Sequence, residues 1–94
     1  MTEQGRLALH LPPVLAELLG YQDITTQGAT LRTALDNAAS QYPALGLHLF
    51  DEAGQVRRHI RIVLNDTIIL TENVASKAVN HGDQIAIINA VSGS

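Results

Sequence analysis

Side chains that could perform covalent or metal chemistry are sparse in this 94-residue chain. It has no cysteine, which excludes thiolate nucleophiles, disulfides, cysteine-bound zinc and iron–sulfur clusters. No serine lies in a nucleophile-elbow sequence. The four histidines are His10, His48, His59 and His81. They show neither H-x-H nor H-E-x-x-H spacing, so no metal site is expected. The residues therefore predict neither a catalytic pair nor an enzyme.

Charged residues gather in two neighbouring segments. Asp51 and Glu52 are adjacent in a predicted loop, where a solvated pair is favoured over an acid–base pair. The segment Arg57-Arg58-His59-Ile60-Arg61 holds three of the six Lys and Arg residues. It fits either contact with a phosphate or an acidic partner, or a solvated strand start that offsets the two acids. Because no aromatic residue lies beside it and the formal net charge is -3, nucleic-acid binding is not expected.

Composition places the chain among small globular domains. With 46% hydrophobic and 16% charged residues it can bury a core, and its length predicts one domain over residues 1–94. No apolar run approaches the roughly 20 residues of a membrane span. The first residues lack the basic-then-apolar order of a signal peptide, so a cytoplasmic protein is expected. No glycine-rich phosphate loop is present, and no bound cofactor is expected.

The elements that position these side chains follow from hydrophobic periodicity. Apolar residues alternate over residues 6–11 and 56–70, with a hairpin turn expected at Asn65-Asp66, and residues 84–91 are apolar on both faces. These three stretches predict strands, and residues 21–26 favour another. Residues 14–19 predict a short helix, and residues 31–42 predict the main helix, opened by Thr30 and ended by Pro43. Residues 44–50 are apolar and irregular, with room for another helical turn. This order predicts an α+β fold, the β-grasp, with one main helix on a mixed sheet.

The predicted core sets which strand faces are left exposed. The stripe formed by Leu31, Ala34, Leu35 and Ala38 is expected to pack on Leu7, Leu9, Ile62, Leu64, Ile85 and Ile87. The last strand is apolar on both faces, so Val63, Ile88 and Ala90 then lie on the outer face. This patch predicts a partner-binding surface. The alternative is that residues 44–50 cover it.

The end of the chain carries a resemblance to a known family. Residues 82–94 read GDQIAIINAVSGS and resemble the end of the ubiquitin-like sulfur carriers, the MoaD/ThiS family, which end in Val-x-Gly-Gly. Further agreement lies in Gly28-Ala29-Thr30-Leu31, in Tyr42-Pro43-x-Leu45, and in Arg61-Ile62-x-Leu64-Asn65. The resemblance covers nearly the whole chain and implies the β-grasp fold.

The resemblance also implies a function that is carried by the C-terminus. In this family an E1-like enzyme uses ATP to adenylate the terminal carboxylate. Sulfur then replaces AMP, and the thiocarboxylate is passed to a sulfur-acceptor synthase subunit in molybdopterin, thiamine or cysteine biosynthesis. The implied activation residues are Gly93 and Ser94, on a flexible tail of residues 91–94. The expected partner-binding residues are those of the outer face, Val63, Ile88 and Ala90, together with Val91 and Ser92.

The sequence departs from the family pattern at its last residue. Ser94 stands where the family has its second glycine, and its side chain crowds a channel shaped for glycine. Three interpretations stay open. The activating enzyme tolerates Ser94; or Ser94 is removed, or the sequence is altered or incomplete at this end; or the chain is a non-reacting interaction or regulatory subunit that has lost the diglycine. Ubiquitin-like tagging of proteins needs the same activated terminus.

Overall fold

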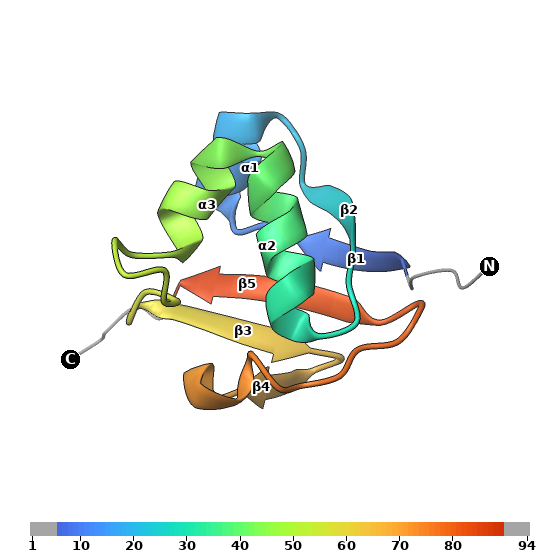
Figure 1. The fold of residues 1–94 in the computed structure, drawn as a ribbon. Coiled ribbons are helices and arrows are strands. Elements are labelled where there is room, and N and C mark those ends of the chain that lie inside the picture. The colour runs from blue at the N-terminus through green and yellow to red at the C-terminus, as the bar shows by residue number, and fades with distance from the viewer. Residues whose placement is uncertain (1–5, 90–94) are drawn as a thin grey trace.

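The computed structural model describes residues 6–89, which form an α+β fold of helices packed on one mixed sheet (Figure 1). The elements in chain order are β1 (Arg6–His10), α1 (Pro13–Leu19), β2 (Asp23–Gln27), α2 (Leu31–Gln41), α3 (Pro43–Leu49), β3 (Ile60–Leu64), β4 (Thr67–Ile69), the 3-10 helix η1 (Thr71–Asn73) and β5 (Gln84–Asn89).

The sheet has the strand order β2-β1-β5-β3-β4, so the last strand lies in the middle. β5 runs parallel to β1, with Leu9 opposite Ile85, and antiparallel to β3, with Ile62 opposite Ile87. The pairs β1–β2 and β3–β4 are antiparallel hairpins. This topology confirms the predicted β-grasp with a mixed sheet.

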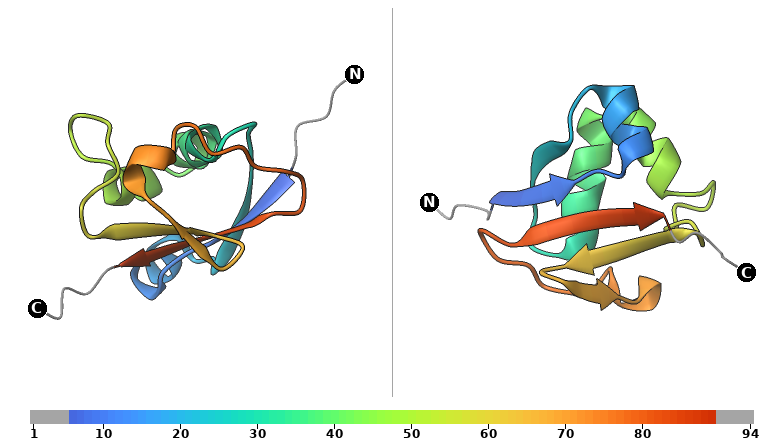
Figure 2. Two further views of the ribbon diagram at one scale, coloured as in Figure 1. Left: turned by 90° about the horizontal axis from the view of Figure 1, so that it is seen from below. Right: turned by 180° about the vertical axis from the view of Figure 1, so that it is seen from behind.

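One face of the sheet is covered by α2, and the other faces outward. In Figure 2 (right) the strands lie toward the viewer and α2 lies behind them. The predicted stripe of α2 is buried, as are the six strand residues expected to pack on it. The core is completed by further buried side chains: Leu15, Ile24, Leu45, Leu49, Val56, Ile60, Val74 and Val79. The predicted core is therefore confirmed and extended by residues from α1, α3, β2, β3 and the loops.

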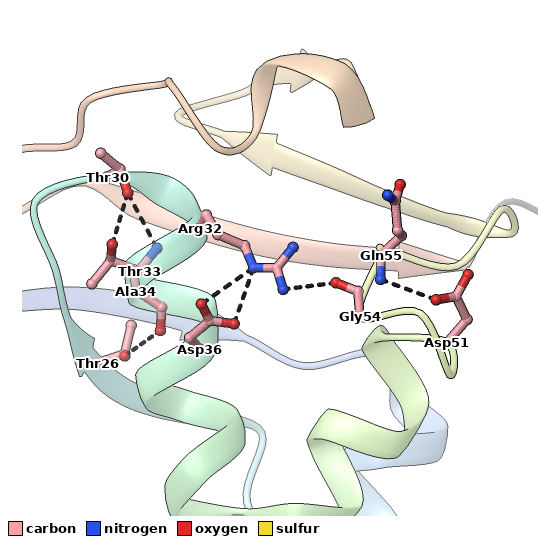
Figure 3. Close-up of polar contacts among 9 residues, drawn as sticks. All are labelled: Thr26, Thr30, Arg32, Thr33, Ala34, Asp36, Asp51, Gly54 and Gln55. Atoms are coloured by element: carbon pink, nitrogen blue, oxygen red, sulfur yellow. Dashed lines mark hydrogen bonds and ion pairs between the residues drawn. The ribbon is translucent and has the colours of Figure 1, made fainter.

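Polar contacts fix where α2 begins (Figure 3). The Thr30 hydroxyl accepts a hydrogen bond from the Thr33 N–H (3.2 Å), which confirms the predicted N-cap. The N–H groups of Leu31 and Arg32 donate to the carbonyls of Lys77 (2.8 Å) and Val74 (3.1 Å). The first N–H groups of this helix, which have no partner within it, are thus bound by the chain's own groups.

The segments on either side of residues 51–55 differ from the expectation. Residues 43–49 form a full helix, α3, in which Gly46 lets the backbone approach α2: a Cβ there would lie 3.1 Å from the Ala39 Cβ. The predicted strand start at Val56 was wrong. Val56 makes only an isolated bridge with Phe50. The Ile60 N–H donates a hydrogen bond to the Arg57 carbonyl in a turn, and β3 begins only at Ile60. Leu70 likewise lies beyond the end of β4.

Candidate functional site

The outer face of the sheet carries one continuous row of side chains across all five strands. Strand register places the row as Asp23, His10, Ala86, Val63 and Ile68. Toward the β4 edge the row is apolar, with Val63 partly exposed and Ile68 60% exposed. Toward the β2 edge it is polar. The face therefore has an apolar half and a polar half.

Ile88 extends the apolar half toward the end of β5. It is 46% exposed and pairs with Arg61, whereas Ile85 and Ile87 on the opposite face are buried. The predicted alternation of β5 is therefore confirmed for its described side chains. The alternative cover by residues 44–50 was wrong, because α3 packs against α2 on the helical side of the sheet. Ile88 and Val63 stay accessible.

A short apolar hollow lies beside Ile88. It is lined by Leu11, Pro12, Pro13 and Val14 on one side and by Ala86 and Ile88 on the other. Val14 is 61% exposed. The connection from β1 into α1 thus continues the apolar surface past the end of β5.

The polar half of the row is organised around His10. The His10 Nδ1 lies 2.5 Å from Asp23 Oδ1, and the His10 Nε2 lies 3.2 Å from Gln84 Oε1. The hydrogen bond with Asp23 raises the pKa of His10 above its ordinary value of 6.5. Gln84 and the negative charge of Asp23 act in the same direction, while partial burial opposes them. His10 was predicted to be exposed and is half-exposed within this network.

The basic segment lies where β5 ends. Ile60, the first residue of β3, pairs with Asn89, the last residue of β5. The Arg57 Nε donates to the Leu47 carbonyl (3.0 Å), and one Arg61 nitrogen donates to the Arg58 carbonyl (2.7 Å). The structure thus places the basic segment beside Ile88, a proximity that depends on strand register and was not predicted.

Asp51 and the histidines were the other candidates for chemistry among the described residues. Asp51 Oδ1 accepts the N–H groups of Ala53 (2.9 Å) and Gln55 (3.0 Å), so it shapes a loop, as predicted. Within residues 6–89 no three His, Asp or Glu side chains gather as a metal site would require. No helix in the same range is long and apolar enough to cross a membrane.

The C-terminal part of the predicted site lies outside the described residues: Ala90, Val91, Ser92, Gly93 and Ser94. What the structure shows is how that segment is attached. It follows directly from the middle strand of the sheet, which is held on both sides by β1 and β3. A strand paired on both sides is a rigid base for the residues that follow it.

Fold and site together define a ubiquitin-like β-grasp domain with an open sheet face. The sequence profile of the ThiS family matches residues 10–93, and the chain belongs to this family. The resemblance to the ubiquitin-like sulfur carriers is thereby confirmed. A search of curated proteins gave no match.

Solved structures show the same fold over the whole chain. The crystal structure of SAMP1 from Haloferax volcanii has a TM-score of 0.82 at 28% identity and covers 96% of this chain and 100% of that chain. Small archaeal modifier protein 1 from Methanosarcina acetivorans has a TM-score of 0.82 at 23% identity, covering 99% and 100%. A chain of the Amycolatopsis orientalis BexX/CysO complex has a TM-score of 0.80 at 24% identity, covering 94% and 99%.

Proposed function

We propose that this chain is a sulfur carrier whose C-terminal carboxylate becomes a thiocarboxylate. Membership of the ThiS family carries the proposal, because the matched region runs from His10, at the end of β1, as far as Gly93. The chain supplies a stable body, an outer face and a C-terminal segment, and the catalytic groups belong to its partners. It is a protein substrate rather than an enzyme.

The proposed reaction takes place on the residues Gly93 and Ser94. An E1-like enzyme transfers AMP from ATP to the terminal carboxylate and releases pyrophosphate. Sulfide, or the sulfur of a persulfide, then attacks the carbonyl carbon, and AMP leaves. With a persulfide, a thiol must cleave the resulting S–S bond to free the thiocarboxylate. A sulfur-acceptor synthase subunit takes up the sulfur for a product of the molybdopterin, thiamine or cysteine type.

Docking is proposed on the outer face near the end of β5. Val63 and Ile88 form its described part, and Ala90, Val91 and Ser92 continue it along the chain. Exposed apolar side chains on a rigid sheet suit a protein partner, since their burial drives association. The same face would serve the adenylating enzyme and the acceptor in turn.

Intact-mass measurement tests the reaction directly. The chain is incubated with an adenylating enzyme of its own source, MgATP and sulfide, and conversion of carboxylate to thiocarboxylate adds about 16 Da. A chain without Gly93 and Ser94 is the negative control. Pyrophosphate release without this gain of about 16 Da would show adenylation without sulfur transfer and would contradict a carrier role.

Ser94 favours a second candidate, a non-reacting interaction subunit of the same fold. Three forms of the C-terminus distinguish a sulfur carrier from an interaction subunit. They are the sequence as given, a chain that ends at Gly93, and the variant Ser94→Gly. A mass gain in any of them supports a carrier and shows which terminus the enzyme accepts. Binding of the enzyme by all three without pyrophosphate release supports the interaction subunit.

A further inference from the structure

A group of cationic side chains lies at the end of the sheet from which the C-terminal segment leaves. We name Arg57, Arg58 and Arg61, together with His59, the basic end. Arg61 pairs with Ile88, and Ile60 pairs with Asn89. These arginines are half of the six Lys and Arg residues in a chain whose formal net charge is -3. Positive charge is thus concentrated in one part of an acidic protein.

The arginines of the basic end are held by groups that do not neutralise them. The Arg57 guanidinium donates to the Leu47 carbonyl, and the Arg61 guanidinium donates to the carbonyls of Arg58 and Ile60 (2.7 and 3.2 Å). Among the described residues, no carboxylate lies within 4.0 Å of these guanidiniums. Arg32 differs, since its Nε lies 3.0 Å from Asp36 Oδ1 in an ion pair. Carbonyl bonds fix a guanidinium in place and leave its charge for another partner.

The acids nearest in the sequence are Asp51 and Glu52, and neither forms an ion pair with the basic end among the described residues. Asp51 accepts two backbone N–H groups within its own loop. Asp66 lies in the β3–β4 turn, and Asp83 is hydrogen-bonded to Asn65 and Asn80 just before β5 begins. The end of the sheet where β5 begins therefore carries charges of both signs, Asp66 and Asp83 together with Arg6 and Lys77, whereas the charge beside the end of β5 is mainly positive. A local excess of positive charge orients an approaching acidic protein.

We infer that the basic end binds an acidic surface on the protein that receives the C-terminal segment. The inference rests on the proposed function and adds the charge of the partner's surface. Ile88, next to Arg61, supplies an apolar centre, and the arginines supply a charged rim, which is the usual composition of a protein interface. The arginines lie beside Asn89, after which the C-terminal segment begins. Binding of the arginines therefore directs this segment toward the active site of the partner. The negative net charge disfavours nucleic acid as the partner.

A titration with poly-L-glutamate tests the basic end without any enzyme. The full chain, labelled with nitrogen-15, is titrated at low ionic strength and its amide shifts are recorded. Shifts centred on residues 57–61 and lost in Arg58→Glu with Arg61→Glu support the inference. Absent shifts, or equal shifts around Arg6 and Lys77, overturn it. Tighter binding of single-stranded DNA of matched charge overturns the assignment to a protein.

Kinetics with the adenylating enzyme test the role in docking. Arg58→Glu with Arg61→Glu is compared with Arg6→Glu and Lys77→Glu, which change the net charge equally at other sites. We expect kcat/KM for the carrier to fall roughly tenfold in the first variant at low salt, and the difference to shrink at high salt. Arg58→Glu alone is a second variant that is expected to fold normally, because the Arg58 side chain forms no hydrogen bond within residues 6–89.

The two proposals fail in different ways. Equal kcat/KM in both double variants, with an active wild-type chain, overturns the inference and leaves the carrier function standing. An inactive wild-type chain contradicts the carrier function. The poly-L-glutamate titration then decides by itself whether the basic end binds acidic polypeptide.

Discussion

Asn65 and Asp83, 18 residues apart in the sequence, are joined by a hydrogen bond from Asn65 Nδ2 to Asp83 Oδ1 (3.1 Å). Asn65 Oδ1 also accepts the Gln84 N–H (2.9 Å), and Asp83 Oδ2 accepts the Asn80 N–H (2.8 Å). Two stretches that carry the family resemblance therefore meet at this contact. It fixes the β3–β4 turn against the first residue of β5 and so determines where the final strand begins.

Replacing Asn65 by Ala is expected to lower the free energy of unfolding by about 1–3 kcal/mol. The change removes both side-chain bonds and places Ala at a φ of 50°, a conformation that Asn tolerates better. Urea denaturation measures the loss. Asn65→Gly separates the two causes, because it removes the bonds and keeps the φ accessible. A loss below about 0.5 kcal/mol in both variants would contradict the role of this contact.

Ile88→Lys is expected to weaken docking strongly and leave the fold intact. Ile88 is 46% exposed, so Lys can be accommodated in the folded chain, whereas a charge in the centre of an interface is costly. We expect affinity for the adenylating enzyme to fall at least about tenfold in a calorimetric titration. Thr25→Lys, on the same face of edge strand β2, is the matched control and keeps its affinity. Equal losses in both variants would contradict a docking site centred on Ile88.

The stability contributed by His10 is expected to decrease as the pH rises. Its pKa is higher in the folded chain than the ordinary 6.5, chiefly through Asp23, so folding favours the protonated ring. That contribution is complete below about pH 6.5 and is lost as the pH passes the raised pKa. The other polar groups around the ring are Gln84, Asn65 and Asp66.

The measurement is the unfolding midpoint of the wild-type chain and of His10→Gln from about pH 6 to about pH 8.5. We expect the wild-type advantage to shrink over this range. An advantage that is constant with pH would show that the Asp23 contact does not stabilise the charged ring.

Gly28→Ala is expected to destabilise the fold by about 1–3 kcal/mol. A Cβ at residue 28 would lie 2.5 Å from the Ala34 backbone nitrogen, in the first turn of α2. Backbone atoms of a helix cannot move aside as a side-chain end can, so β2 and α2 would have to separate. Thermal unfolding measures the effect. Gln27→Ala, at the exposed neighbouring position, is expected to stay within about 0.5 kcal/mol of the wild type.

Ile62→Ala is expected to cost about 2–5 kcal/mol of unfolding free energy. Ile62 is 1% exposed and lies between Ile87 of β5 and Ile69 of β4. Truncation leaves a cavity beneath α2 that rigid neighbours cannot fill. Ile62→Val should cost only about 0.5–1.5 kcal/mol, and denaturant titration compares the two. Similar losses in both variants would argue against a cavity as the cause.

The parts of the fold that could be predicted were those with a clear hydrophobic periodicity in the sequence. Alternation in residues 6–10 and 84–88 predicted which side chains point inward, and the stripe of α2 predicted its buried face. The strand expected from Val56 shows the limit of the method. Its residues alternate correctly, but the Arg57 N–H bonds to the Leu49 carbonyl of α3, a tertiary contact without a local signal.

The candidate site was predictable in its composition and only partly in its geometry. Val63 and Ile88 were placed on the outer face by alternation alone. The His10 network was missed, because it joins residues 13 and 74 positions apart through the registers of two strand pairs. The basic segment could be seen in the sequence, but its position beside the end of β5 depends on the pairing of β3 with β5.

The central position of β5 has a consequence for the order of folding. Until residues 84–89 have been synthesised, β1–β2 and β3–β4 are two separate hairpins with no strand between them. Isolated hairpins are marginal in water, so the chain acquires its native body only after residues 84–89 have been made. A partner that recognises the assembled sheet will therefore bind chains that contain β5 in preference to shorter chains that lack it.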